Sequence, residues 1–205
     1  MENLEKIIEF LHEIGNLKKT MRFGANDLIK GDSSADHSWR LALMTFVMAE
    51  ELNLEIDVLR AMKIALIHDL AEAITGDIDI RIIAAKKMTK EQKEKMEMEA
   101  FENLRKSLPY DLGKEVYELW KEYENGSSSE GKYIKALDKL ETQLKIIEEG
   151  YKVYDSPELI ANYPNKAVEN FPELTPVLKI IKEKLKEEFK KGDFEWKPEY
   201  DMQIK

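Results

Sequence analysis

Cysteine is absent from the 205 residues of this chain, which excludes disulfide bonds and thiolate metal sites. Any transition metal must therefore be held by histidine and carboxylate groups, and the chain has only three histidines. The sequence also lacks an apolar run near the roughly 20 residues that a membrane-spanning helix needs. Its first residues are acidic and lack the basic and apolar pattern of a signal peptide. These absences predict a cytoplasmic protein that does not enter a membrane.

Positive charge is also in deficit, because 32 lysines and arginines are outnumbered by 41 aspartates and glutamates. The net charge of −9 argues against bulk electrostatic binding of nucleic acid, which needs a basic surface. A small anionic substrate stays compatible, since a metal ion and one or two arginines can reverse the potential locally. The chain length favours a single domain with a substantial core.

Period-two alternation is missing as well, so no stretch predicts a strand. Apolar residues recur at helical spacing through segments such as 2–14, 56–74 and 175–191, and we therefore expect an all-α protein. We expect one domain over residues 1–192. We expect the aromatic tail, 193–205, to pack on that domain or on a second subunit.

Two pairs of residues predict helix starts. Thr89 with Gln92 has the spacing of a capping box, in which each side chain binds the other residue's backbone N–H. Ser127 with Glu130 has the same spacing and precedes a helix that carries Asp138. Both pairs favour helices in the second half of the chain.

The segment that begins at His68 contains several side chains that could bind a metal ion. If the helix over 56–74 is continuous, His68, Asp69 and Glu72 lie together within one turn. A divalent ion favours such a mixture of imidazole and carboxylates. Residues 64–70 are mainly apolar, where an unpaired charge would be costly. A lone His-Asp pair is more often a buried structural pair, so this segment by itself leaves both interpretations open.

Two further residues lie in comparable surroundings. His37 is one turn before Leu41, on the apolar side of its helix, and Asp138 interrupts the apolar run 133–140. Each of them alone is more often structural than a metal ligand. The ordered set of a histidine, a His-Asp pair and a distant aspartate favours a shared metal site.

Four segments carry a resemblance to a known family. They are LKKTMRF at 17–23, SADHS at 34–38, HDLAEAITGD at 68–77 and LDKLE at 137–141. In this order they resemble the HD-domain phosphohydrolases, and within them the branch of the 5′-deoxynucleotidases. The resemblance spans about residues 15–150, and the block at 68–77 is its most specific part.

The resemblance implies an HD-domain helical bundle with a divalent metal cofactor, which would be Mn²⁺, Co²⁺, Mg²⁺, Ni²⁺ or Zn²⁺. Glu72 and Asp77 match positions that are needed for activity, where they would orient or deprotonate the attacking water. A second ion at Glu72 and Asp77 is an open alternative. The implied metal ligands are His37, His68, Asp69 and Asp138.

The same resemblance implies substrate contacts. Arg22 matches an arginine that grips phosphate, for which the fork of guanidinium donors is well suited. Phe23 stands where relatives often carry tryptophan beside the sugar and base, and the smaller ring leaves the sugar preference open. Asp77 and Asp79 match substrate-contacting positions, with Asp79 near a sugar hydroxyl, and Lys30 is a looser candidate for charge near the phosphate.

These expectations describe an enzyme that hydrolyses nucleoside 5′-monophosphates, in particular the 2′-deoxy forms, to nucleoside and phosphate. The resemblance also suggests a homodimer. Three alternatives stay open: another HD-type enzyme (a dNTP triphosphohydrolase or a small phosphate-ester phosphatase), a non-catalytic nucleotide or metal sensor, and a structural helical protein. Glu72 and Asp77 argue against the sensor, because a sensor needs no water-activating acid.

Overall fold

The computed structural model describes residues 1–24, 26, 28–29 and 31–201. Lys30 and the last residues of the expected tail, 202–205, lie outside this part of the chain. The described residues form helices and connecting loops, with a single isolated β-bridge between Met21 and Ser33. The all-α prediction is therefore confirmed. None of the described helices combines the length and apolar character that crossing a bilayer requires.

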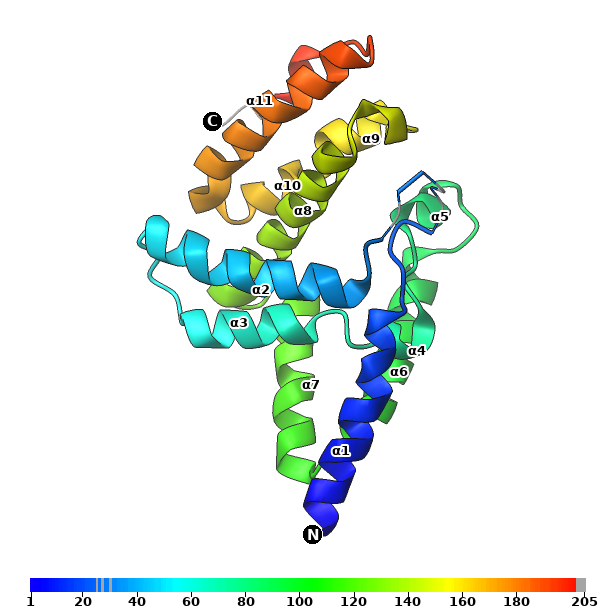
Figure 1. Cartoon of the computed structure of the whole chain (residues 1–205). Helices are drawn as coiled ribbons and strands as arrows, with labels where there is room; N and C mark the ends of the chain where they lie inside the picture. Colours follow the sequence, from blue (N-terminus) through cyan, green and yellow to red (C-terminus); the bar gives the residue numbers. More distant parts are fainter. Residues whose placement is uncertain (25, 27, 30, 202–205) are drawn as a thin grey trace.

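The elements follow one another with short connections, apart from the stretch between η1 and α2 (Figure 1). In chain order they are α1 (Glu2–Ile14), η1 (Gly15–Lys18), α2 (Ser34–Glu51), α3 (Val58–Ile67), α4 (Glu72–Thr75), α5 (Ile80–Ala84), α6 (Lys90–Lys106), α7 (Tyr110–Asn125), α8 (Ser129–Glu149), η2 (Tyr151–Val153), α9 (Pro157–Asn162), α10 (Asn165–Glu169), η3 (Pro172–Leu174), α11 (Thr175–Lys191) and η4 (Pro198–Tyr200).

Helix α8 is the centre of the fold. It packs against α2 and α3, which lie side by side, and it also contacts α7 and α11 (Figure 1). Tyr133, Ile134, Leu137 and Leu140 on α8 are fully buried in the main apolar cluster. Burying each side chain of this size contributes roughly 1.5–3 kcal/mol. This packing places Asp138, on the same helix, next to the start of α2 and the end of α3.

Two smaller apolar clusters flank the main one. One contains Phe101 and Trp120, whose rings stack at a centroid distance of 4.5 Å and join α6 to α7. The other is aromatic and gathers around Phe189 of α11, with Trp196 and Tyr200 from the segment that follows. The described part of the expected tail thus packs on α11, while the division into a domain and a tail stays a prediction.

The helices predicted over 2–14 and 175–191 are confirmed by α1 and α11. Of the other predicted boundaries, one is confirmed and two are wrong. Thr89 and Gln92 form the expected capping box at the start of α6. The second box is wrong: the Ser128 side chain, one residue later, accepts from the Gly131 N–H and caps α8. Glu130 is not available for a box, because its carboxylate accepts a hydrogen bond from the backbone N–H of Asp57 at the start of α3.

The continuous helix predicted over 56–74 is also interrupted. Helix α3 ends at Ile67, and the backbone then tightens, since the N–H of Glu72 donates to the carbonyl of Asp69, three residues back. Helix α4 begins only at Glu72. His68 and Asp69 therefore lie in the connection between two helices, and the single helical turn that was expected to hold them is not formed.

Candidate metal centre

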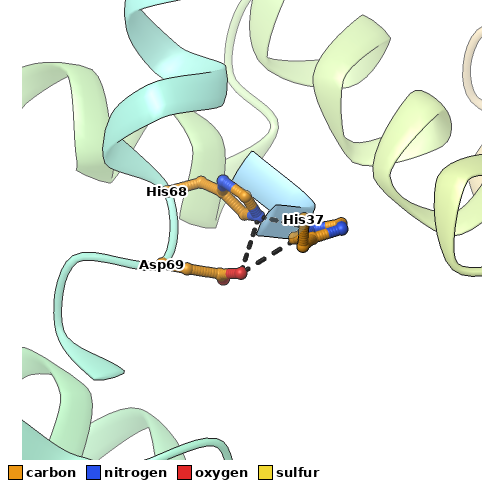
Figure 2. A group of neighbouring side chains, drawn as sticks. All are labelled: His37, His68 and Asp69. Carbon is orange, nitrogen blue, oxygen red and sulfur yellow. Dashed lines mark hydrogen bonds and ion pairs between the residues drawn. The ribbon is translucent and has the colours of Figure 1, made fainter. Parts of the chain in front are cut away.

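Three of the predicted ligands, His37, His68 and Asp69, lie close together. His37 is in the first turn of α2, and His68 and Asp69 are in the connection between α3 and α4. The Nε2 atoms of His37 and His68 are 3.2 Å apart, and Asp69 Oδ2 lies 3.0 Å from His68 Nε2 and 3.7 Å from His37 Nε2 (Figure 2). One ligand atom from each of the three side chains lies within 4.8 Å of the other two. Two imidazoles and a carboxylate around one point form a donor set that suits a divalent transition-metal ion such as Zn²⁺ or Mn²⁺.

The remaining nitrogen of each imidazole is engaged by an acceptor. His68 Nδ1 lies 2.8 Å from the Ala65 carbonyl oxygen, which can only accept, so Nδ1 donates. His37 Nδ1 donates to Glu141 Oε2 at 2.5 Å. These outer hydrogen bonds orient both rings so that Nε2 faces the shared point, as is typical of metal-binding histidines.

The charges around His37 favour a cation at this point. Burial and the nearby Arg22 act to lower the pKa of His37, but hydrogen bonds with Asp138 and Glu141 outweigh them and raise it to about 9. A metal ion bound at Nε2 competes with this proton, because only the deprotonated nitrogen is a ligand. The site is therefore built to stabilise positive charge.

Asp138, the fourth predicted ligand, lies next to His37. Its Oδ1 is 3.2 Å from His37 Nε2, while its Oδ2 accepts from the Tyr123 hydroxyl and from Lys139 Nζ, both at 2.8 Å. Burial opposes ionisation, but Lys139 and His37 hold the pKa of Asp138 well below its usual value. Asp138 thus contributes a fixed negative charge next to His37.

Two further carboxylates behave differently. Burial, reinforced by the charges of Asp69 and Asp77, raises the pKa of Glu72 well above its usual value, although Ser34 Oγ donates to its Oε2 at 2.5 Å. Burial and the charges of Asp69 and Asp79 also raise the pKa of Asp77. A carboxylate with a raised pKa holds a proton more readily than usual, which favours a role as a general acid or base.

The centre opens onto a cavity of about 400 Å³, a size typical of small-molecule sites. His68, Asp69, Glu72, Asp77 and Asp138 lie on its wall, so the metal-binding groups and the two acids with raised pKa face the same space. The wall is completed by apolar side chains from the segment around α5 and from α8 and α9, which are Ile78, Ile80, Ile83, Ile146, Leu159 and Ile160.

The HD domain family model matches residues 14–171, which include all four predicted ligands. The chain is 41% identical over 144 residues to the 5′-deoxynucleotidase HDDC2 of Bos taurus, a match covering 69% of this chain and 67% of the relative. To the 5′-deoxynucleotidase HDDC2 of Xenopus laevis it is 34% identical over 184 residues, which cover 87% of each chain. This chain belongs to the HD-domain family.

Solved structures support the fold of this HD-domain protein. A predicted metal-dependent phosphohydrolase from Magnetospirillum magnetotacticum has a TM-score of 0.77 at 24% identity, covering 94% of this chain and 96% of the other. A conserved hypothetical protein from Pyrococcus furiosus has a TM-score of 0.67 at 31% identity, covering 86% and 99%. The expected HD-domain bundle, recognised from four short segments, is confirmed.

The predicted phosphate ligand of this HD-domain protein is largely engaged by its own chain. Arg22 lines the cavity, but its Nη1 donates to Asp32 Oδ2 at 3.0 Å and to Glu141 Oε2 at 3.3 Å. Its Nη2 donates to Thr142 Oγ1 at 2.8 Å. The guanidinium also lies 5.1 Å from the ring centroid of Phe23. Arg22 therefore braces α8 against the loop before α2, and its contact with phosphate stays a prediction.

The other predicted substrate residues also line the cavity. Phe23 has a positive φ of 61°, an uncommon conformation for a residue with a side chain, and its N–H donates to Asp77 Oδ2 at 3.2 Å. Asp79 caps α5 and pairs with Arg81. These contacts fix the loop after α4 beside the metal centre, and a substrate contact of Asp79 is a prediction that they leave untested.

Sequence reasoning missed two residues that support the HD-domain centre. Glu141 is fully buried and binds both His37 Nδ1 and Arg40 Nε. Its spacing of i+3 from Asp138 places both on one face of α8, and this signal was available in the sequence. Tyr123 packs edge-on against His68 at a centroid distance of 5.0 Å and binds Asp138. No spacing along the chain indicates that contact.

Proposed function

We propose that this HD-domain protein is a metal-dependent phosphohydrolase that converts nucleoside 5′-monophosphates, in particular the 2′-deoxy forms, to nucleoside and phosphate. The observation that carries the proposal is the pair of facing Nε2 atoms with Asp69 on the wall of a cavity that also holds Glu72. The substrate class is taken from the relatives named 5′-deoxynucleotidase.

In this proposal His37, His68 and Asp69 hold a divalent ion, with Asp138 as the fourth group. Such an ion supplies Lewis acidity toward a phosphate oxygen and lowers the pKa of a water molecule. Water adds to phosphorus, the bond from phosphorus to the 5′ oxygen breaks, and the departing oxygen takes a proton. Glu72 accepts a proton from the water and, with its raised pKa, can return it to the leaving oxygen.

The finer parts of the proposal concern assembly and cofactor number. We propose a homodimer acting in the cytoplasm on a small nucleotide, without a nucleic-acid partner. A second ion at Glu72 and Asp77 is the alternative to their role toward water. Light scattering after size-exclusion chromatography tests the dimer, and metal analysis of the purified protein counts the ions.

A screen of ribo- and deoxyribonucleoside 5′-monophosphates against Mn²⁺, Co²⁺, Mg²⁺, Ni²⁺ and Zn²⁺ tests the proposed activity. We expect release of free phosphate, faster from the deoxy forms, with at least one of these ions. Tripolyphosphate released from a dNTP, without phosphate from any monophosphate, would assign the protein to the triphosphohydrolases instead. Absence of turnover with every ion would leave a sensor or a structural protein.

A further inference from the structure

Among the described residues that line the cavity beside the metal centre, one lysine forms no ion pair with a carboxylate. Within residues 1–24, 26, 28–29 and 31–201, Lys135 forms neither an ion pair nor a hydrogen bond with an acceptor, although it lies on the cavity wall. The other lysines and arginines of the wall are each paired with a carboxylate. These pairs are Arg22–Asp32, Arg81–Asp79, Lys90–Glu94, Lys93–Glu97 and Lys139–Asp138.

Lys135 is held close to the metal centre by its position on α8. It precedes Asp138 by three residues, so both side chains lie on one face of the helix. Its Nζ lies 4.5 Å from the centroid of the Tyr123 ring. The same ring contacts His68, and its hydroxyl donates to Asp138. A single aromatic side chain therefore separates the Lys135 ammonium from two of the predicted metal ligands.

The surroundings of Lys135 only partly compensate its charge. Burial lowers its pKa and outweighs the attraction of Glu124 and Asp138, and Lys139 and Lys90 add repulsion. The face of an aromatic ring attracts a cation only modestly. A half-buried ammonium with this environment gains from an anionic ligand that enters the cavity, since the ligand supplies the missing counter-charge.

Arg22, which lines the same cavity, offers a contrast. Both of its terminal nitrogens already donate to Asp32, Glu141 and Thr142. A phosphate that binds Arg22 must share these donors with the protein or replace existing acceptors. The three N–H groups of Lys135 meet no such competition from the described residues.

We propose that Lys135 is a substrate-binding residue whose ammonium donates hydrogen bonds to a phosphate oxygen of the bound nucleotide. This inference rests on the proposed function and names a residue of the same site. Lys135 binds the phosphate from the Tyr123 side, and Arg22 provides a fixed positive field elsewhere on the cavity wall. The role is positioning by charge and hydrogen bonds, without proton transfer.

The test compares Lys135→Met with Lys135→Arg and with Lys132→Met. Lys132 is an exposed lysine on the same helix and does not line the cavity, which makes it a matched control. For each Mn²⁺-loaded protein, KM and kcat are measured with deoxyadenosine 5′-monophosphate, and inorganic phosphate is tested as a competitive inhibitor. Calorimetry gives the Kd of inorganic phosphate directly, and metal analysis together with thermal unfolding verifies each variant.

We expect Lys135→Met to raise KM and the phosphate inhibition constant by about tenfold or more, since a hydrogen bond to a charged group contributes about 1.5–3 kcal/mol. kcat should change much less, Lys135→Arg should restore most of the affinity, and Lys132→Met should behave as the unaltered protein. Unchanged phosphate affinity in a folded, metal-loaded Lys135→Met protein would overturn the proposal. So would a loss of bound metal in that variant, because the effect would then belong to the metal centre.

Failure of the proposed function gives a different result. If the unaltered protein releases no phosphate from any nucleoside monophosphate, the activity assignment fails. The calorimetric Kd of inorganic phosphate still decides the role of Lys135 in that case. A Lys135→Met variant that unfolds is replaced by Lys135→Gln, whose amide retains polar character without the charge, and the same comparison applies.

Discussion

Buried charge is handled in two different ways in this molecule. Near the C-terminus, Lys182 of α11 donates to the carbonyl oxygens of Ala161 and Tyr200, so its ammonium is satisfied by the chain itself. At the metal centre, the Nε2 atoms of His37 and His68 lie 3.2 Å apart with Asp69 beside them. Lys182 borders a smaller cavity of about 300 Å³ with its donors already used by the chain. The metal centre faces a larger cavity and concentrates donors for a cation.

The difference separates a structural role from a functional one. A buried polar group whose hydrogen bonds are satisfied within the chain stabilises the packing around it. A cluster of negatively charged and lone-pair donors around one point is unfavourable by itself and becomes favourable when a cation binds. Changes at the metal centre should therefore affect activity more than stability, and changes around Lys182 should do the reverse.

Replacing His68 should have the largest effect. His68→Ala removes one of the two Nε2 donors, so we expect loss of bound metal and a fall in phosphate release of at least about a thousandfold. The melting temperature of the metal-free protein should change little. His12→Ala is the matched control, because His12 is exposed on α1 and does not line the cavity. If His68→Ala keeps both its metal and its turnover, the proposed difference between a functional metal centre and a structural site around Lys182 is wrong.

Glu72 should come next. Glu72→Gln keeps the hydrogen bond from Ser34 but removes the group that exchanges a proton, so we expect kcat to fall by about 10²–10⁴-fold. Metal content should be unchanged, as measured by elemental analysis. A loss of one ion per chain would instead assign Glu72 to a second metal site, and an unchanged kcat would exclude both roles.

A smaller effect is expected at Glu141, which orients His37. Glu141→Gln should weaken metal binding by about 10–100-fold, because partners that fix a metal-binding histidine have effects of this size. Glu148→Gln is the control, since Glu148 pairs with the same Arg40 but is exposed. Isothermal titration with Mn²⁺ measures both variants. Equal Mn²⁺ affinities of the two variants would show that the hydrogen bond between Glu141 and His37 Nδ1 does not support metal binding.

The smallest effect should appear at Lys182 and only in stability. Burial lowers the pKa of Lys182 to about 8, against its usual value of 10.5. Folding therefore disfavours the charged form below pH 8, and this penalty disappears as the pH rises through the interval from 8 to 10.5. The free energy of unfolding of the unaltered protein should rise over that interval relative to Lys182→Met, with kcat alike in both. Parallel pH profiles would contradict the pKa shift.

Local patterns in the sequence predicted much of the fold. The capping box of Thr89 and Gln92 is formed within four residues, and the start and end of α11 follow from periodicity and Gly192. The continuous helix over 56–74 was wrong because the backbone tightens after Ile67, where the apolar pattern continues without a break. The spacing of apolar residues indicates which face of a helix is buried. It does not reveal where backbone hydrogen bonds change from i−4 to i−3 acceptors.

The candidate site was predictable in its ligands and less so in their surroundings. His37, His68 and Asp69 were recognised by order and residue type, and the structure brings them together. Asp138 lies beside them. Two of the partners of Arg22, Glu141 and Thr142, lie more than a hundred positions away along the chain. These contacts depend on how α8 crosses the loop before α2. Contacts of that kind follow from tertiary packing and have no local signal.

Titration of metal back into stripped protein tests the central claim most directly. The protein is treated with a chelator until elemental analysis finds no divalent metal, and phosphate release from deoxyadenosine 5′-monophosphate is then followed as Mn²⁺ is added. We predict no turnover at the start, and a rise that follows Mn²⁺ occupancy of the centre until the centre is filled. Full turnover by protein verified to be free of metal would contradict the account.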